Sequence, residues 1–163
     1  HENAFQWYMK AAQQGIPEAQ NNIGLFYSKG EGVPQNYKEA VRWYTEAAEQ
    51  GEPEAQFNLG VSYHNGYGIP QNNEVAFHWY LEAAQQGHTS AQNNLGGLYL
   101  YGSGVPQSYE DAYVWAALAA AAGHENARKN RNLIAKQLSP SSLENAQKKA
   151  QDYFAKYKNR GPI

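Results

Sequence analysis

The sequence contains no cysteine, which excludes disulfide bonds, zinc sites built on thiolates and cysteine nucleophiles. It also lacks any apolar run near the roughly 20 residues that cross a bilayer, so we expect no membrane insertion. The formal net charge is only −2 and 42% of the 163 residues are hydrophobic, which is typical of a folded domain and not of a disordered chain. A chain without thiols tolerates both reducing and oxidising surroundings, so the compartment stays open.

Charge is distributed unevenly along the chain. Residues 1–122 carry 4 Lys or Arg against 12 Asp or Glu, whereas residues 123–163 carry 9 against 3. The basic end is either a well-solvated terminal cap or a surface that steers an oppositely charged partner. The chain begins without methionine or an apolar leader, so we interpret it as a fragment or a processed form whose export signal would lie outside it.

A 36-residue repeat dominates the sequence. Residues that recur at this spacing include Trp7, Trp43, Trp79 and Trp115; Gly15, Gly51, Gly87 and Gly123; and Pro34, Pro70 and Pro106. Chance does not place several registers in phase, and a period of this length indicates stacked supersecondary units. We therefore predict an array of like units.

Each repeat is predicted to hold two helices, A and B. Helix A of the second repeat spans about residues 53–65, because Ala55, Leu59 and Tyr63 form one apolar stripe at a spacing of four. Helix B of the preceding repeat spans about residues 37–50, where apolar residues recur at i, i+3, i+4, i+7 and i+8. The fold class is therefore all-α, built from antiparallel helix pairs.

Three glycines lie in the middle of helix A, namely Gly24, Gly60 and Gly96. Each costs about 1 kcal/mol relative to alanine in a helix interior. Because this cost recurs at one register, we predict that helix B packs there too closely for a side chain to fit. The tryptophans of helix B are then expected to fill the wider gaps between repeats.

The string Ala55-Gln56-x-x-Leu59-Gly60-x-x-Tyr63-x-x-Gly66-x-Gly68-Ile69-Pro70-Gln71, followed by Ala76-x-x-Trp79-Tyr80-x-x-Ala83-Ala84-x-x-Gly87, resembles the Sel1-like repeat, a relative of the tetratricopeptide repeat. The resemblance covers about residues 4–127. It implies a right-handed α–α superhelical solenoid whose A helices line a concave surface and whose B helices form the outer wall.

A single domain over residues 1–163 follows from this resemblance. Its segments are the second helix of a truncated leading repeat at 1–16, full repeats at 17–52, 53–88 and 89–124, and capping helices at 125–163. In the fourth unit Arg131 and Asn132 replace the Leu-Gly pair, as expected of a terminal unit with a polar outer face.

Motifs for catalysis or metal binding are weak. The Gly-x-Gly segments, such as residues 30–32, follow a helix and precede a proline, so they indicate a helix stop and a turn and not a phosphate loop. No two histidines lie three or four residues apart, and Arg128 stands where a partner of His124 would be needed. No serine has nucleophile-elbow context. We expect no enzyme activity, no metal and no cofactor.

Nucleic-acid binding is also not expected. It would need a basic face with interleaved aromatic residues, and only the last 40 residues are basic. The aromatic cluster there, Tyr153, Phe154 and Tyr157, has helical spacing and is predicted to form the core of the cap.

The face of helix A that does not pack is the expected partner-binding surface, because its residues vary between repeats while the core residues do not. The predicted contact residues are Asn21, Asn22, Leu25, Lys29, Phe57, Asn58, Val61, His64, Asn65, Asn93, Asn94, Leu100, Tyr101 and Asn130. Phe57 and Tyr101 are either binding hot spots or ordinary exposed aromatics.

Four of these residues, Asn22, Asn58, Asn94 and Asn130, form a ladder at 36-residue steps. An amide carries a donor and an acceptor, so a row of amides is suited to hold the main chain of an extended peptide. The resemblance supports this use, since tetratricopeptide modules employ an asparagine at the matching position. The alternative is that each amide caps or bridges neighbouring A helices.

The leading hypothesis is a protein–protein interaction scaffold that binds a peptide or protein segment and is itself a monomer. A second hypothesis is cell-envelope glycan binding, which uses aromatic faces and amides, and the chain has 13 tyrosines. A third, less favoured, is a hydrolase acting on cell-wall or β-lactam substrates, an activity claimed for some relatives. The family also makes a bacterial periplasmic or secreted location one expectation, which the sequence does not decide.

Overall fold

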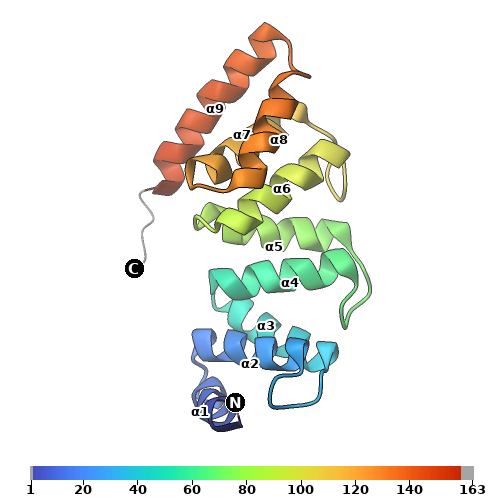
Figure 1. Ribbon diagram of the computed structural model, residues 1–163, viewed down its shortest axis with the longest axis vertical. Coiled ribbons are helices and arrows are strands. Elements are labelled where there is room, and N and C mark those ends of the chain that lie inside the picture. Colours follow the sequence, from blue (N-terminus) through green and yellow to red (C-terminus); the bar gives the residue numbers. More distant parts are fainter. Residues whose placement is uncertain (1, 159–163) are drawn as a thin grey trace. The chain divides into compact units, whose positions relative to one another are not determined.

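The computed structural model describes residues 2–158, which form α-helices joined by short loops, with no strand among them (Figure 1). These helices are α1 (Glu2–Gln13), α2 (Pro17–Lys29), α3 (Tyr37–Glu49), α4 (Pro53–Asn65), α5 (Asn73–Gln85), α6 (Thr89–Tyr101), α7 (Tyr109–Ala121), α8 (Glu125–Ala135) and α9 (Pro140–Lys158). Within this range no helix is both long and apolar enough to cross a bilayer. Residues 1 and 159–163, at the two ends of the predicted domain, lie outside the described residues.

Packing divides the chain into two compact units, residues 1–79 and 80–163. The first unit holds α1 to α4 and the start of α5, and the second holds the rest of α5 and α6 to α9. By their place in the repeat, α2, α4, α6 and α8 are A helices, and α1, α3, α5 and α7 are B helices. The longest helix, α9, follows the last A helix.

Local chemistry sets the helix boundaries. α4 begins at Pro53, in the first turn, where a missing N–H costs nothing, and the Glu52 carboxylate accepts a hydrogen bond from the Ala55 N–H. It ends before Gly66, whose φ of 73° lies in the left-handed region. The predicted span of helix A is therefore confirmed. α3 ends at Glu49, one residue earlier than predicted.

Two histidines form caps that their residue type alone does not suggest. His88 and His124 lie 36 residues apart, immediately before α6 and α8. Their Nδ1 atoms accept hydrogen bonds from the N–H groups of Ala91 at 3.1 Å and Ala127 at 3.2 Å. Both imidazole rings thus cap the N-terminus of a helix. No group of three or more His, Asp or Glu side chains arranged for a metal occurs between residues 2 and 158.

The contact between α2 and α3 in the first unit, which we call a seam, is as close as Gly24 in the middle of α2 predicts. A Cβ atom on Gly24 would lie 2.5 Å from Cε1 of Tyr44, which is closer than real Cβ contacts come. Tyr44 is buried, and its hydroxyl donates a hydrogen bond to Ser28 Oγ at 3.2 Å. Burial raises the pKa of the Tyr44 hydroxyl. In this unit the glycine makes room for an aromatic ring.

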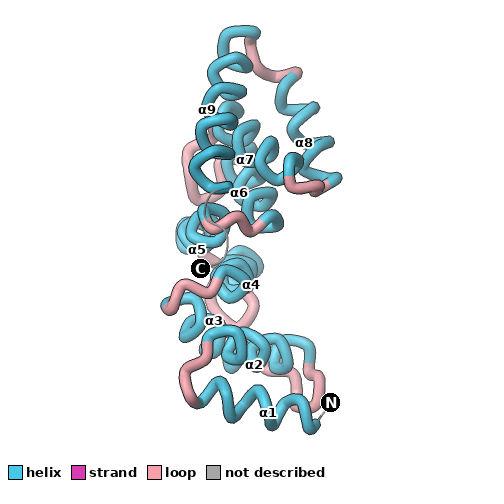
Figure 2. The backbone as a smooth tube through the Cα atoms, turned by 90° about the vertical axis from the view of Figure 1, so that its left-hand side faces the viewer, coloured by secondary structure: helices cyan, strands magenta, loops and turns pink. Residues whose placement is uncertain are grey.

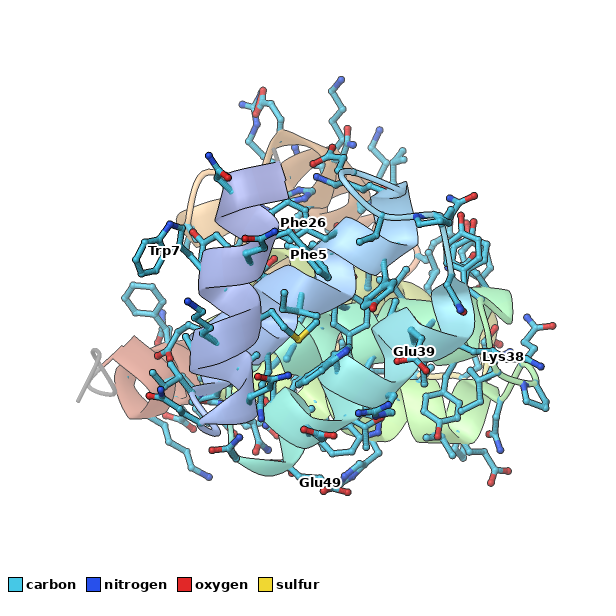
Figure 3. All side chains as sticks on the ribbon, turned by 90° about the horizontal axis from the view of Figure 1, so that it is seen from below. Phe5, Trp7, Phe26, Lys38, Glu39 and Glu49 are labelled. Atoms are coloured by element: carbon cyan, nitrogen blue, oxygen red, sulfur yellow. The ribbon has the colours of Figure 1, made fainter. Side chains whose placement is uncertain are left out.

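The tryptophans that recur every 36 residues do not all have the same role. Trp43 on α3 is buried against Ala12 and Ile23, as predicted. Trp7 on α1, at the same register, is 73% exposed, and its ring projects outward from α1 in Figure 3. The prediction that every such tryptophan fills a gap is wrong for Trp7, because α1 packs against α2 and no described helix covers its other side.

The second unit is built around α7, which packs against α6, α8 and α9. As on α2, the mid-helix glycine of α6 lies at the seam, and a Cβ on Gly96 would lie 3.3 Å from the Ala112 carbonyl oxygen. Among the described residues, α8 and α9 each pack mainly on α7, where Ile134 and Ala146 join one buried cluster, and Figure 2 shows α7 between the two helices. α9 therefore does not form a regular A–B pair with α8.

The aromatic rings of α9 fasten it to α7. Trp115 is 3% exposed, and its ring lies 5.5 Å from the Tyr153 centroid and 5.9 Å from that of Tyr157. Lys149 Nζ lies 2.6 Å from Asp111 Oδ1, and this hydrogen bond raises the pKa of Lys149. The predicted cap core is confirmed for Tyr153 and Tyr157, but it is wrong for Phe154, which is exposed.

A repeated glutamine holds each loop between an A helix and the next B helix. The Nε2 groups of Gln35, Gln71 and Gln107 donate to the main-chain oxygens of Ser28, His64 and Leu100 at 2.8, 2.7 and 2.8 Å. In the first unit the Tyr67 ring also stacks on Tyr37, with 5.1 Å between centroids. The Gly-x-Gly segments lie in these loops, as the interpretation of a helix stop and turn requires.

Candidate protein-binding surface

We call the predicted contact positions on the A helices the recognition face. In the first unit these positions belong to α2 and α4, and in the second unit to α6 and α8. Because the residues at these positions differ in burial and in hydrogen bonding, each unit has its own surface.

The amides of the first unit bridge α2 and α4. Asn58 Nδ2 donates a hydrogen bond to Asn21 Oδ1 at 2.9 Å. Asn21 is only 5% exposed, so its side chain is not available to a partner as the sequence interpretation requires. The physical reason is that Asn21 faces the neighbouring A helix and satisfies the Asn58 amide there. Asn22, beside it, is half-buried, and its side-chain amide makes no hydrogen bond to any described residue.

The apolar positions of the first unit are half-buried. Leu25 packs against the buried cluster that contains Tyr44 and Leu59, so part of its side chain belongs to the core. Phe57 and Val61 on α4 are likewise half-buried. These side chains present only part of their surface to a partner.

The C-terminal ends of α2 and α4 are polar. Lys29 and Asn65 are exposed, and Asn65 Nδ2 donates to the Val61 carbonyl oxygen at 2.9 Å. His64 is half-buried. The recognition face of the first unit is therefore mixed, with amides in the middle and polar groups at one end.

The amides of the second unit have different partners. Asn94 is hydrogen-bonded to the Tyr80 hydroxyl. Burial raises the pKa of Tyr80 to about 12, and the bond to Asn94 acts in the opposite direction. Asn93 Oδ1 is buried and accepts no hydrogen bond within residues 2–158. Asn130 on α8 is exposed. The four ladder amides thus do not share one role.

Tyr101 at the end of α6 is 79% exposed. One turn before it, Gly97 is open to solvent, since a Cβ built there would meet nothing within 4 Å. Leu100 packs partly against the core around Ile134, so it contributes less to the surface than Tyr101 does. The exposed part of α6 is accordingly an aromatic ring beside a bare stretch of helix.

Leu133 on α8 is 60% exposed and was not among the predicted contact residues. It lies 36 residues after Gly97 and therefore at the register of Leu25 and Val61, which is the signal that finds it. Lys129, four residues before it on α8, and Lys136, three residues after it at the C-cap of this helix, are both exposed. α8 thus shows an apolar side chain between two cations.

Comparisons with known proteins agree with this architecture. The Sel1 repeat model matches residues 1–16, 17–52, 53–88 and 89–124. The crystal structure of a Sel1 repeat protein from Oxalobacter formigenes is 31% identical, with a TM-score of 0.76 over 93% of this chain and 46% of that one. The structure of c5321, a protective antigen present in uropathogenic Escherichia coli strains that displays an SLR fold, is 32% identical, with a TM-score of 0.64 over 94% of this chain and 41% of that one.

Similarity to a curated protein is more limited. The chitin synthase regulator SKT5 of Saccharomyces cerevisiae is 46% identical over 37 residues, which is 23% of this chain and 5% of that protein. The chain spans less than half the length of each of these three relatives.

Proposed function

Because the chain belongs to the Sel1 repeat family, an all-α solenoid fold whose members generally act as protein–protein interaction scaffolds, we propose that it binds a peptide or protein segment on the recognition face of its A helices. The fold is typically a scaffold without catalytic activity, and we propose the same for this chain. The observation that carries the proposal is the exposure of Tyr101 on the recognition face of the second unit.

The surroundings of Tyr101 support binding. Tyrosine is enriched at interface centres because its ring buries a large apolar area while its hydroxyl finds a polar partner. Gly97 leaves the adjacent turn of α6 without a side chain, so the main chain of a partner is free to approach the helix closely. Tyr101 then provides the anchor and Gly97 the space beside it.

The charge on α8 favours an acidic partner. Leu133 offers apolar area, and Lys129 and Lys136 on either side of it have no ion pair with any described residue. A partner with an apolar side chain between acidic residues complements these three side chains. Such rim charges act mainly on the association rate and its salt dependence, so we expect association to slow as ionic strength rises.

The four asparagines of the ladder have two different roles in this proposal. Asn58 and Asn94 already bond to Asn21 and Tyr80, and these bonds hold their amides in fixed orientations. Asn22 and Asn130 have no such bond within the described residues and are the amides we expect to meet the main chain of a partner.

Site-specific crosslinking tests the proposal. A photoreactive phenylalanine at position 101 is expected to crosslink one host protein, whereas the same group at Tyr109, an exposed position on the B helix α7, is expected not to. With the purified partner, Tyr101→Ala and Leu133→Asp should each weaken binding by roughly tenfold or more, as loss of an interface anchor does.

Both variants should keep their circular dichroism and melting temperature, because the two side chains are exposed. Full affinity of the Tyr101→Ala and Leu133→Asp proteins, or crosslinking only from position 109, would show that the partner binds elsewhere.

A further inference from the structure

The first unit contains a partly buried polar cluster around Gln20, at the junction of α1, α2 and α3. Gln20 Nε2 donates to the Ala12 carbonyl oxygen and to Glu46 Oε2, both at 3.3 Å. Its Oε1 accepts a hydrogen bond from Gln50 Nε2 at 2.7 Å. Both ends of this buried amide therefore have partners, and the Gln50 side chain occupies the space beside it.

The second unit has the buried glutamine but lacks the two side chains that hydrogen-bond to it in the first unit. Gln92, 72 residues after Gln20, is 5% exposed, and its Nε2 donates to the Ala84 carbonyl oxygen at 3.2 Å. The positions of Glu46 and Gln50 are taken by Leu118 and Ala122. Gln92 Oε1 accepts no hydrogen bond from any described group.

A cavity of about 160 Å³ lies where the missing glutamine side chain would be. Its lining residues are Gly87, Gln92, Leu118, Ala122, Phe154 and Tyr157. Leu118 and Tyr157 are buried, whereas Gly87, Ala122 and Phe154 are exposed, so the cavity has a closed floor and an open rim. It is mainly apolar, with two aromatic rings from α9 and one unused acceptor.

The size and chemistry of this cavity select a ligand. A cavity of about 150 Å³ in an apolar core accommodates benzene, so this pocket has room for one aromatic ring, with the rest of a ligand passing through the open rim. Gln92 lines this open cavity, so a ligand that displaces water from its Oε1 has to supply a donor, because an acceptor left unpaired on burial is costly. A phenol ring supplies both the apolar area and an O–H donor.

We propose that this cavity is a binding pocket for a tyrosine side chain of a partner protein. This proposal rests on the proposed scaffold function, and it adds a second contact point, separate from the recognition face. The ring packs between Leu118 and the aromatic residues of α9, and its hydroxyl donates to Gln92 Oε1.

Titration of the whole chain with small probes tests the pocket directly. p-Cresol, the tyrosine side chain itself, and N-acetyltyrosinamide should both bind, with dissociation constants on the order of 1 mM, as one-ring ligands do. Toluene and N-acetylphenylalaninamide should bind about three- to tenfold more weakly, because they leave the acceptor unpaired. Shifts of the Gly87 N–H and the Gln92 side-chain amide in NMR spectra report occupancy at this site.

A pair of matched variants completes the test. Ala122→Gln introduces the residue that the first unit has at this register, Gln50, and the new side chain should fill the pocket and donate to Gln92 Oε1. We therefore expect p-cresol affinity to fall by more than tenfold, while the melting temperature is unchanged or higher. Ala121→Gln, at the exposed neighbouring position, should bind p-cresol as the wild type does. Equal affinity for p-cresol and toluene, or unchanged binding by Ala122→Gln, overturns the proposal. Binding of p-cresol without N-acetyltyrosinamide also overturns it, since the pocket would then take free phenols and not a presented tyrosine.

The outcome is separable from that of the proposed function. Tyr101→Ala is expected to leave p-cresol binding unchanged, because Tyr101 does not line the pocket. Failure of the probes alone removes the pocket and leaves the recognition face intact. If the partner is indifferent to Tyr101→Ala and Leu133→Asp while the probes bind, the recognition face fails and the pocket stands.

Discussion

Replacement of Trp115 by alanine is expected to lower the free energy of unfolding by about 3–5 kcal/mol, the usual cost of truncating a buried aromatic. Trp115 is almost fully buried in the second unit, and its ring meets both Tyr153 and Tyr157. Its removal therefore empties the contact between α7 and α9. Urea unfolding followed by circular dichroism measures the change.

Trp7→Ala is the matched control, because it deletes the same side chain at the same register of the repeat. Trp7 is largely exposed, so we expect a change within about 0.5 kcal/mol, as at other surface positions. Equal losses from the two substitutions would mean that tryptophan stabilises each helix locally and not through packing between helices.

Gly96→Val is expected to destabilise the second unit by about 1–3 kcal/mol, the cost of overpacking a filled contact. A Cβ at this position would already lie 3.3 Å from the Ala112 carbonyl oxygen and 3.5 Å from the Ala116 nitrogen. Both are main-chain atoms of α7, so the branched side chain forces the two helices apart. The melting temperature and the urea midpoint should both fall.

The next residue of α6 supplies the control. Gly97→Val adds the same atoms to open space, so its effect should stay within about 0.5 kcal/mol, set by helix propensity alone. A loss at Gly97 as large as that at Gly96 would show that any branched residue harms α6, and that the close approach of α7 is not the reason for the glycine.

The helices themselves could be predicted from the sequence because their determinants are local. Proline in the first turn and glycine after the last residue bracket α4, and the apolar spacing defines its buried stripe. The mid-helix glycines similarly predicted a close seam, since a cost repeated at one register needs a compensating contact. At Gly24 and Gly96 the structure confirms that contact.

The surface could be predicted only in part. Tyr101 is exposed as the variation between repeats suggests, but Asn21, chosen by the same reasoning, is buried against Asn58. The register identifies the side of the helix on which a residue lies and not the neighbour it meets there. Leu133 was missed because Arg131 and Asn132, just before it, depart from the repeat pattern. Position 133 itself still follows that pattern.

The amino-acid sequence alone determined the repeat, the helix pairs and the small-residue seams, because each depends on residues close together in the chain or on the repeat itself. Only the tertiary structure decided that Trp7 is exposed while Trp115 is buried, that α9 packs on α7, and that Ala122 leaves a cavity beside Gln92. Those outcomes depend on which helix lies next to each residue, and identical positions in a repeat have different neighbours at the two ends of an array.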